Sequence, residues 1–291
     1  MIRHTFCHVP SIGIHTEQIL WDSGVLSWDN VLNGSPAASS LKPGRLRTLL
    51  YHLSQSEASL SEGDTRYFDD LLPAHQAWRY FTDFRSSIAY LDIETTGMGS
   101  DADHITTIAL YDGRSIRCYV HGQNLEQFED DILDYKVIVT YNGKTFDVPF
   151  IRRDRRIPMD HTHIDLRYIL KSLGYRGGLK GCERQLGIHR DDLDGVDGLF
   201  AVWLWDEFRR NRNERALETL LAYNVMDVVN LETLMVIAYN EKLKSTPFET
   251  SLALDVPERP ELPYEPHRPT IETIRHRMAG MFTAPHFWGR P

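Results

Sequence analysis

Two carboxylates stand one residue apart at the end of an apolar run, in the segment Tyr90-Leu91-Asp92-Ile93-Glu94-Thr95-Thr96-Gly97. Because side chains alternate between the two faces of a strand, Asp92 and Glu94 are expected on the same face. Carboxylate oxygens suit hard divalent cations such as Mg²⁺ or Mn²⁺, whereas a set of His and Cys residues would indicate zinc. By itself the pair is also typical of an exposed strand end, so its interpretation depends on further acids.

A second acidic position, Asp147, follows the apolar run Val137-Ile138-Val139 and an Asn142-Gly143 loop, where a helix is expected to begin. Asp147 could cap a helix that starts at Val148, because Pro149 would then occupy the first turn, where proline is favoured. An ordinary cap would not require the Asn-Gly loop before it. A capping aspartate can still offer a free oxygen, so both interpretations stay open.

Tyr223 and Asp227 lie four residues apart in a long stretch that predicts a helix from Glu214 to about Leu243. This spacing puts the phenol and the carboxylate on one face of the helix. The face could be solvated, or the pair could serve a metal and a water. What favours the second interpretation is the order of all three segments, which chance would rarely assemble.

In this order the three segments resemble the three exonuclease motifs of the DnaQ-like, DEDD-type exonucleases of the ribonuclease H-like superfamily. Tyr223 matches the tyrosine branch of that family, since the histidine branch would place His at position 222, where this sequence has Ala222. The pattern of residues 178–188 is closer still to bacterial YprB-like ribonuclease-H-type proteins. The resemblance covers about Tyr90 to Leu234 and implies an α/β fold, a mixed sheet flanked by helices.

The resemblance implies that Asp92, Glu94, Asp147, Tyr223 and Asp227 form a 3′-to-5′ exonuclease site. The four acids would hold two Mg²⁺ or Mn²⁺ ions roughly 4 Å apart, with Asp92 bridging them and Asp147 completing the second site. Tyr223 would orient the attacking water, because a phenol with a pKa near 10 is a poor base but a good hydrogen-bond partner. The four carboxylates must then meet in space, and the assignment fails if they are scattered or if one of them instead forms a buried ion pair with an arginine.

Nucleic acid is the expected partner, as single-stranded 3′ ends, with DNA and RNA both open because the sequence does not place any contact to a 2′-hydroxyl. The basic run at 152–156 follows Asp147 closely and could take phosphates, although charge runs are usually solvated. Residues 10–25 resemble a helix-hairpin-helix, whose amides hold a phosphate backbone, but Ser11 replaces its usual first glycine and a small helical cap is the alternative. The expected nucleic-acid contacts are Thr95, Thr96, Asn142, Arg152, Arg153 and Gly13.

Three other functions are compatible with parts of this pattern. A structure-specific ribonuclease H-like endonuclease would use the same metal chemistry, since end specificity comes from closure of the pocket. A non-catalytic nucleic-acid-binding module would keep the fold, although the intact acid set argues against it. A polymerase proofreading domain would need a polymerase-sized partner that this chain does not contain.

The chain divides into three predicted regions: helical residues 1–84 with the possible hairpin, a ribonuclease H-like exonuclease domain at 85–244, and a Pro-rich tail at 245–291 expected to be extended or disordered. Alternating strand and helix signals begin at Ser87. The predicted strands are Ile88–Asp92, Ile105–Tyr111, Ile116–His121, Val137–Thr140 and His163–Asp165. The predicted helices include Pro43–Ser54, Leu125–Leu133, Val148–Asp154, Leu166–Leu173, Leu179–Leu186, Leu199–Arg210 and Glu214–Leu243.

The composition, 42% hydrophobic and 25% charged in 291 residues, is that of a globular protein. No window approaches the run of about eighteen apolar residues that a membrane span needs, and residues 1–17 lack a signal peptide's apolar region, so a cytoplasmic protein with no membrane contact is expected. Cys7, Cys118 and Cys182 form no disulfide framework, which fits a reducing compartment. The formal net charge of −9 is unusual for a nucleic-acid binder, but bound metal ions reverse the local field. The sequence does not indicate an oligomeric state.

Overall fold

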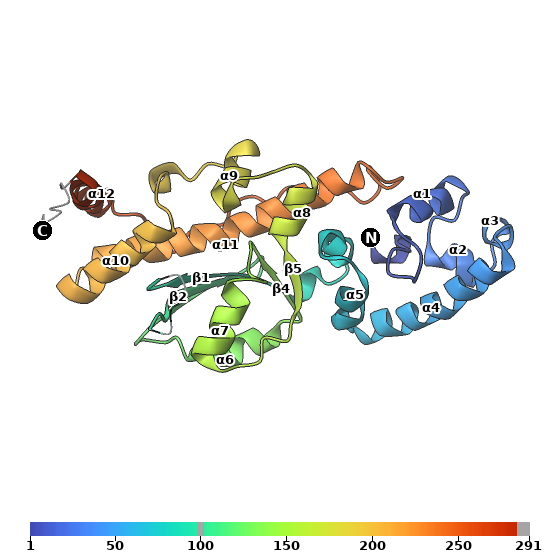
Figure 1. Ribbon diagram of the computed structural model, residues 1–291, viewed down its shortest axis with the longest axis horizontal. Helices are drawn as coiled ribbons and strands as arrows, with labels where there is room; N and C mark the ends of the chain where they lie inside the picture. Colours follow the sequence, from blue (N-terminus) through green and yellow to red (C-terminus); the bar gives the residue numbers. More distant parts are fainter. Residues whose placement is uncertain (98–99, 101, 284–291) are drawn as a thin grey trace, which may run out of the picture.

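The computed structural model describes residues 1–97, 100 and 102–283 (Figure 1). At its centre lies a five-stranded sheet in the order β3-β2-β1-β4-β5. β1 pairs antiparallel with β2 and parallel with β4, so the predicted mixed sheet is confirmed. The strands are β1 (Ile88–Thr95), β2 (Ile105–Tyr111), β3 (Ile116–Val120), β4 (Val137–Thr140) and β5 (Thr162–Asp165).

Helices cover both faces of the sheet (Figure 1). One face carries α11 (Glu214–Leu243) with α8 (Leu166–Ser172) and α9 (Gly178–Gln185), and the other carries α6 (Gln127–Asp131) and α7 (Asp147–Arg155). Side chains alternate along β1: Tyr90 joins the core beneath α11, whereas Leu91 joins the core beneath α6 and α7. By the same alternation Asp92 and Glu94 lie on the α11 side of the strand.

The long helix α11 is the buried centre of the layer above the sheet, and α10 (Gly198–Asn211) packs against it. Among the described residues it is the one helix whose length and hydropathy would suffice to cross a membrane. However, 89% of its most apolar 18-residue window is buried inside the protein, so packing in the core accounts for its composition.

The N-terminal region is helical, as predicted, but differs in detail. Its helices are α1 (Ile14–Asp22), α2 (Trp28–Leu32), α3 (Pro36–Ser39), α4 (Pro43–Glu62) and α5 (Thr65–Leu71), followed by a 3₁₀ segment at Ala74–Tyr80. Ahead of α1, within residues 1–13, the structure has a 3₁₀ turn at Ile2–His4 and no α-helix, so the helix-hairpin-helix is not confirmed. α4 continues past the predicted end at Ser54. It ends at Gly63, whose left-handed backbone conformation terminates the helix.

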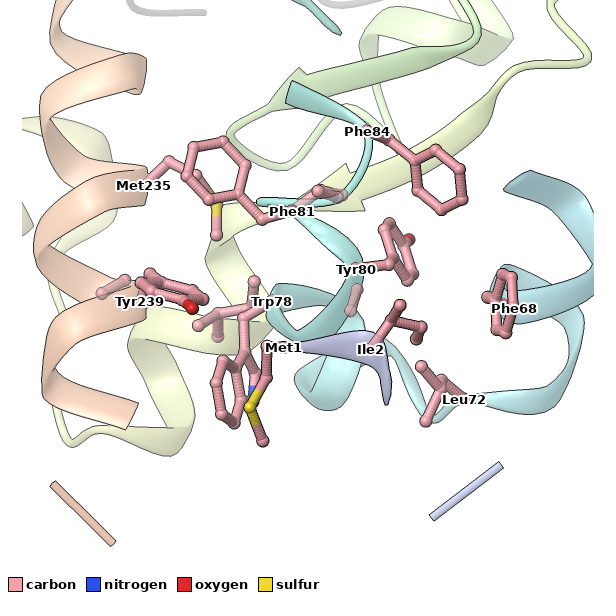
Figure 2. Close-up of a cluster of buried hydrophobic side chains, with 14 of the residues drawn as sticks. Met1, Ile2, Phe68, Leu72, Trp78, Tyr80, Phe81, Phe84, Met235 and Tyr239 are labelled. Atoms are coloured by element: carbon pink, nitrogen blue, oxygen red, sulfur yellow. The ribbon is translucent and has the colours of Figure 1, made fainter. Parts of the chain in front are cut away.

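The N-terminal region and α11 share one hydrophobic core. Figure 2 shows Trp78 and Phe81 of the N-terminal region beside Met235 and Tyr239 of α11, with Ile2 from the start of the chain close by. The ring centroids of Trp78 and Tyr239 are 5.7 Å apart, in an edge-to-face arrangement. The region at 1–84 is therefore packed directly on the long helix that crosses the sheet.

The C-terminal region departs from the sequence-based expectation. Residues 245–267 contain no helix or strand, but Arg268–Thr283 form α12, so the prediction of an extended or disordered tail is wrong for this segment. All the prolines from 247 to 269 precede α12 or fall in its first turn, where proline is tolerated. Ile271 and Ile274 are buried in a cluster with residues of α10 and α11, and this packing holds the helix in place.

Candidate metal centre

Three carboxylates from β1 and α11 meet at one point. Asp92 and Glu94 extend from β1 toward α11, and Asp227 extends from α11 toward the strand. Each can offer one oxygen such that the three oxygens lie within 4.8 Å of one another. A group of hard oxygen ligands at this spacing fits a divalent cation of the Mg²⁺ or Mn²⁺ type.

Asp147 lies in the same cleft but outside this closest group. It is the first residue of α7, and the capping position is Phe146, which forms no side-chain cap hydrogen bond. The interpretation of Asp147 as a helix cap is therefore wrong. Its buried carboxylate is directed to the acidic cleft instead, as a ligand role would require.

The Asn142-Gly143 loop has a structural reason. Asn142 is left-handed, with φ of 70°, and a Cβ at Gly143 would come within 2.3 Å of the Thr140 hydroxyl oxygen, so only glycine fits. The buried carboxylate of Asp165 accepts hydrogen bonds from the amides of Asn142 (2.8 Å) and Lys144 (3.1 Å), and it also caps α8. The prediction that Asp165 is a cap rather than a ligand agrees with these contacts.

The acids strongly perturb one another. Burial, followed by the charge of Asp227, raises the pKa of both Asp92 and Glu94 well above the ordinary value. Burial raises the pKa of Asp147 to about 7, with Asp165 and Asp227 adding to the effect and backbone hydrogen bonds opposing it. Carboxylates crowded in this way hold protons unless a cation compensates them, so the donor set fits divalent metal ions.

Asn224, one residue after Tyr223, fixes the orientation of Asp92. Its amide nitrogen donates to the Asp92 Oδ2 at 2.7 Å, and its own oxygen accepts from the Thr107 hydroxyl at 3.0 Å. The side chain of Asn224 is fully buried. A buried amide held at both ends leaves Asp92 one preferred orientation.

Asp227 also forms a buried ion pair with an arginine. Arg190 contacts the Asp227 Oδ1 and is held by Glu183 through two hydrogen bonds of 2.6 Å. Glu183 in turn accepts a hydrogen bond of 2.9 Å from Asn230. The assignment required all four acids to meet, and three of them, Asp92, Glu94 and Asp227, do so. It also required that no acid pair with a buried arginine, and the pair between Asp227 and Arg190 does not meet this condition.

Tyr223 lies at the acid cluster and is paired with a lysine. Lys180 donates a hydrogen bond of 2.7 Å to the Tyr223 hydroxyl, and it also donates to the carbonyl of Val196. Burial, followed by the charge of Asp227, raises the pKa of Tyr223 well above its ordinary value. The phenol is therefore protonated at neutral pH. Its oxygen accepts the hydrogen bond from Lys180, and its proton can be donated to another group.

The acids open into a cleft of about 960 Å³. Of the expected nucleic-acid contacts, Thr95, Thr96 and Asn142 line it. Arg152 and Arg153 do not: Arg152 binds the carbonyl of Met159 and pairs with Asp160, and Arg153 donates to the carbonyl of Asp103. Gly13 lies in the N-terminal region, where it borders a separate hollow with residues 7–12, Asp70 and Leu71.

The structure adds three residues that the sequence did not single out for the site. Asn224 could have been suspected, because a buried polar residue between Tyr223 and Asp227 needs a partner. Lys180 lies in the stretch that carries the family resemblance, but nothing local shows that it reaches Tyr223. Arg190 follows α9 in a loop, and its approach to Asp227 depends on tertiary packing alone.

Comparisons with known proteins show which family the chain belongs to. Residues 89–239, more than half of the chain, match the family model of the RNase H superfamily. The chain is 28% identical over 175 residues to an uncharacterised protein, YprB, of Bacillus subtilis (strain 168); the match covers 52% of this chain and 42% of that relative, so the chain spans less than half of the relative's length. A family B DNA polymerase from the archaeon Pyrobaculum calidifontis is similar over 62% of this chain and 31% of its own, with 17% identity and a TM-score of 0.41. By the family match, the chain belongs to the RNase H superfamily.

Proposed function

We propose that this protein is a metal-dependent 3′-to-5′ exonuclease that hydrolyses phosphodiester bonds in nucleic acid. The observation that carries the proposal is the meeting of the Asp92, Glu94 and Asp227 oxygens within 4.8 Å in a cleft of an RNase H superfamily chain. The tyrosine-branch motif, with Tyr223 four residues before Asp227, supports the choice of 3′-end trimming over internal cutting.

The chain's acids would hold two Mg²⁺ or Mn²⁺ ions, with Asp92, Glu94 and Asp227 on one and Asp92 and Asp147 on the other. Bound at this place, such ions would supply an activated water and neutralise the charge of the phosphate under attack. The contact with Arg190 is at Oδ1 of Asp227, and among the described residues no hydrogen bond or ion pair is recorded at its Oδ2. Asp227 can therefore contact a cation through that oxygen while Arg190 stays in place.

The roles of the neighbouring side chains follow from their protonation. A protonated Tyr223 would donate a hydrogen bond to the attacking water or to a phosphate oxygen, and it would not abstract a proton. Lys180 donates a hydrogen bond to the phenol oxygen. The phenol oxygen is thereby used as an acceptor, and the Tyr223 hydroxyl is left to donate its own proton toward the water or the phosphate. Asn224 holds the carboxylate of Asp92 in one orientation, in which it would contact the ions.

The test is a cleavage assay on end-labelled single- and double-stranded DNA and RNA, with Mn²⁺ or Mg²⁺ added. Single-nucleotide products accumulating from the 3′ end are expected, and discrete internal fragments would instead identify an endonuclease. Asp92→Asn should abolish cleavage, and Tyr223→Phe should lower it roughly 10²-fold, because it removes one hydrogen bond in the transition state.

The matched control is Asp130→Asn. This carboxylate is exposed in α6, on the opposite face of the sheet, so its loss should leave the rate unchanged. Circular dichroism should show that Asp92→Asn remains folded. Cleavage that persists at the wild-type rate in Asp92→Asn would contradict the proposal.

A further inference from the structure

One wall of the acidic cleft is basic. Arg167 and Lys171 of α8, Arg176 of the connection that follows, and Lys180 of α9 all line the cleft that contains the carboxylates. In a chain with 41 acidic and 32 basic residues, such a concentration of cations is a local feature rather than a property of the whole surface. It lies where the phosphates of a bound polynucleotide would need compensating charge.

Two of these four cations have no partner within the described part of the chain. Lys180 is bound to Tyr223, and Arg167 donates to the Asn142 side chain. Lys171 and Arg176 are exposed, and no hydrogen bond or ion pair of their side chains is recorded among the described residues. Their charges therefore do not serve the fold and are available to a ligand.

The arginines of α7, which the sequence suggested for this task, are placed differently. Arg152 pairs with Asp160, and Arg155 pairs with Glu129 at 2.5 Å. The guanidinium of Arg153 lies over the Phe150 ring, 4.2 Å from its centroid. None of the three lines the cleft, so the basic wall at Lys171 and Arg176 replaces them as the candidate phosphate contact.

The wall contributed by α10 is apolar. Leu199 and Val202 line the cleft there, and Leu199 is 52% exposed, so its side chain is accessible to a ligand in the cleft. Tyr175, between Lys171 and Arg176 in the sequence, adds an aromatic ring to the lining. Cations combined with aromatic and apolar surface are the composition that single-strand binders use, with phosphates on the cations and base faces on the rings.

We propose that Lys171 and Arg176 bind the backbone phosphates of a single nucleic acid strand leading away from the metal centre. Tyr175 and Leu199 provide the apolar surface on which its bases lie. The proposal rests on the function proposed above in taking nucleic acid as the substrate. It adds which wall of the cleft binds the strand. It also adds that this binding does not depend on the nucleotide sequence.

The experiment measures binding without cleavage. Fluorescence anisotropy with labelled oligothymidylate and, separately, oligouridylate is recorded in EDTA over about 20 to 200 mM salt. The slope of log K against log salt is negative, and each lost phosphate contact reduces its magnitude by about 0.7 for a single strand, so the double variant Lys171→Gln/Arg176→Gln should reduce it by about 1.4. Comparing the two oligonucleotides shows whether DNA, RNA or both are held.

The control variant is Arg45→Gln/Arg47→Gln, which removes the same charge from two exposed positions of α4 in the N-terminal region. It should keep the wild-type slope, and so should Arg152→Gln/Arg153→Gln. The proposal is overturned if the wild-type protein binds neither oligonucleotide, if Lys171→Gln/Arg176→Gln keeps the wild-type slope, or if the α4 control lowers it equally. If binding depends on Lys171 and Arg176 but no cleavage occurs in Mn²⁺, only the proposed exonuclease function is refuted. If cleavage occurs but Lys171→Gln/Arg176→Gln keeps the wild-type salt slope, only this inference is refuted.

Discussion

Asp227 has neighbours of both charge signs. Asp92 and Glu94 bring like charge within 4.8 Å, and Arg190 brings a guanidinium to its Oδ1. Arg190 is 4% exposed and is itself anchored by Glu183, so it cannot move away without leaving that carboxylate buried and unpaired. In the absence of a divalent ion, this guanidinium and the Lys180 ammonium offset the concentration of negative charge.

Removing Arg190 should therefore destabilise the metal-free protein strongly. Arg190→Gln leaves Glu183 and Asp227 without their buried counter-ion, and the free energy of unfolding should fall by about 3–5 kcal/mol in EDTA. Mn²⁺ should restore part of the loss, because it neutralises Asp227. Urea unfolding with EDTA and with Mn²⁺ measures both values. Arg210→Gln, which breaks the 2.6 Å ion pair of the exposed Arg210 with the partly exposed Asp206 on α10, is the control and should cost at most about 1 kcal/mol.

The raised pKa of Asp147 predicts a pH dependence of stability. A carboxylate whose pKa is about 7 in the folded chain and about 4 in the unfolded chain binds its proton more tightly when folded. Its contribution to stability is thus complete below pH 4 and is lost as the pH rises through 7. Buried His8 and His163, with pKa values lowered to about 3, act in the opposite direction.

The measurement is therefore the difference between wild type and Asp147→Asn, from urea unfolding in EDTA at several pH values. Relative to the variant, the wild type should lose stability between about pH 4 and pH 7. Added Mn²⁺ should stabilise the wild type more at pH 8 than at pH 5, because the metal binds the deprotonated carboxylates. A difference that does not change with pH would show that Asp147 is not a perturbed acid.

How far single residues could be predicted depends on whether their partners are local. Asp92, Glu94, Tyr223 and Asp227 were identifiable from the order of their three segments and its resemblance to a family, while periodicity indicated which side chains share a face. The structure brings the three acids together. Arg190 was not, because its contact with Asp227 spans a loop and two helices. The position of Arg190 beside the acids can therefore be seen only in the tertiary structure.

At the scale of elements, the β4–α7 connection is a rigid support for Asp147. Asn142, Gly143 and Asp165 fix this loop by a left-handed turn, a close approach to Thr140 and two amide hydrogen bonds. α7 then begins at Asp147 itself, so the position of the carboxylate follows the loop directly.

Gly143→Ala should consequently affect both stability and metal binding. The added methyl would approach Thr140 Oγ1 and Cβ at 2.3 and 2.6 Å, and relief of this overlap should cost about 1–3 kcal/mol. Because the loop must shift, the affinity for Mn²⁺, measured by calorimetry, should also fall. Gly44→Ala, a helical glycine of α4 with nothing within 4 Å of the added carbon, should be neutral or stabilising. Unaltered stability of Gly143→Ala would contradict the close packing.

Sequence periodicity predicted some elements well and others poorly, for physical reasons. β2, β4 and α11 have the predicted bounds, because each is an apolar run ended by polar or turn residues. α4 and α12 were underestimated, since their polar surfaces conceal short buried stripes such as Ile271 and Ile274. A helix that packs through two buried residues has only a weak hydrophobic periodicity in its sequence. This periodicity does not outweigh the many prolines nearby, which predict an extended segment.

At the scale of the whole molecule, the helical residues 1–84 and the sheet region are joined through a common core. Met1, Ile2 and Trp78 lie in the same cluster as Met235 and Tyr239 of α11 (Figure 2), and Asp227 belongs to that same helix. The N-terminal region thus stabilises the helix that carries one acid of the candidate metal centre, and its predicted boundary at residue 84 does not separate two independent cores.

This arrangement predicts that the two regions unfold together. Trp78 is 1% exposed and packs edge-to-face on Tyr239, so Trp78→Ala should lower the free energy of unfolding by about 3–5 kcal/mol. If the core is shared, fluorescence and far-ultraviolet circular dichroism should report one coincident urea transition in wild type and variant. Stability gained from Mn²⁺ binding should then protect the amides of α4 as well as those of α11 from hydrogen exchange. The contrary result is that the N-terminal helices unfold in a separate, earlier transition, with Mn²⁺ stabilising only the second transition. That result would show that the contact at Trp78 is not coupled to the candidate metal centre.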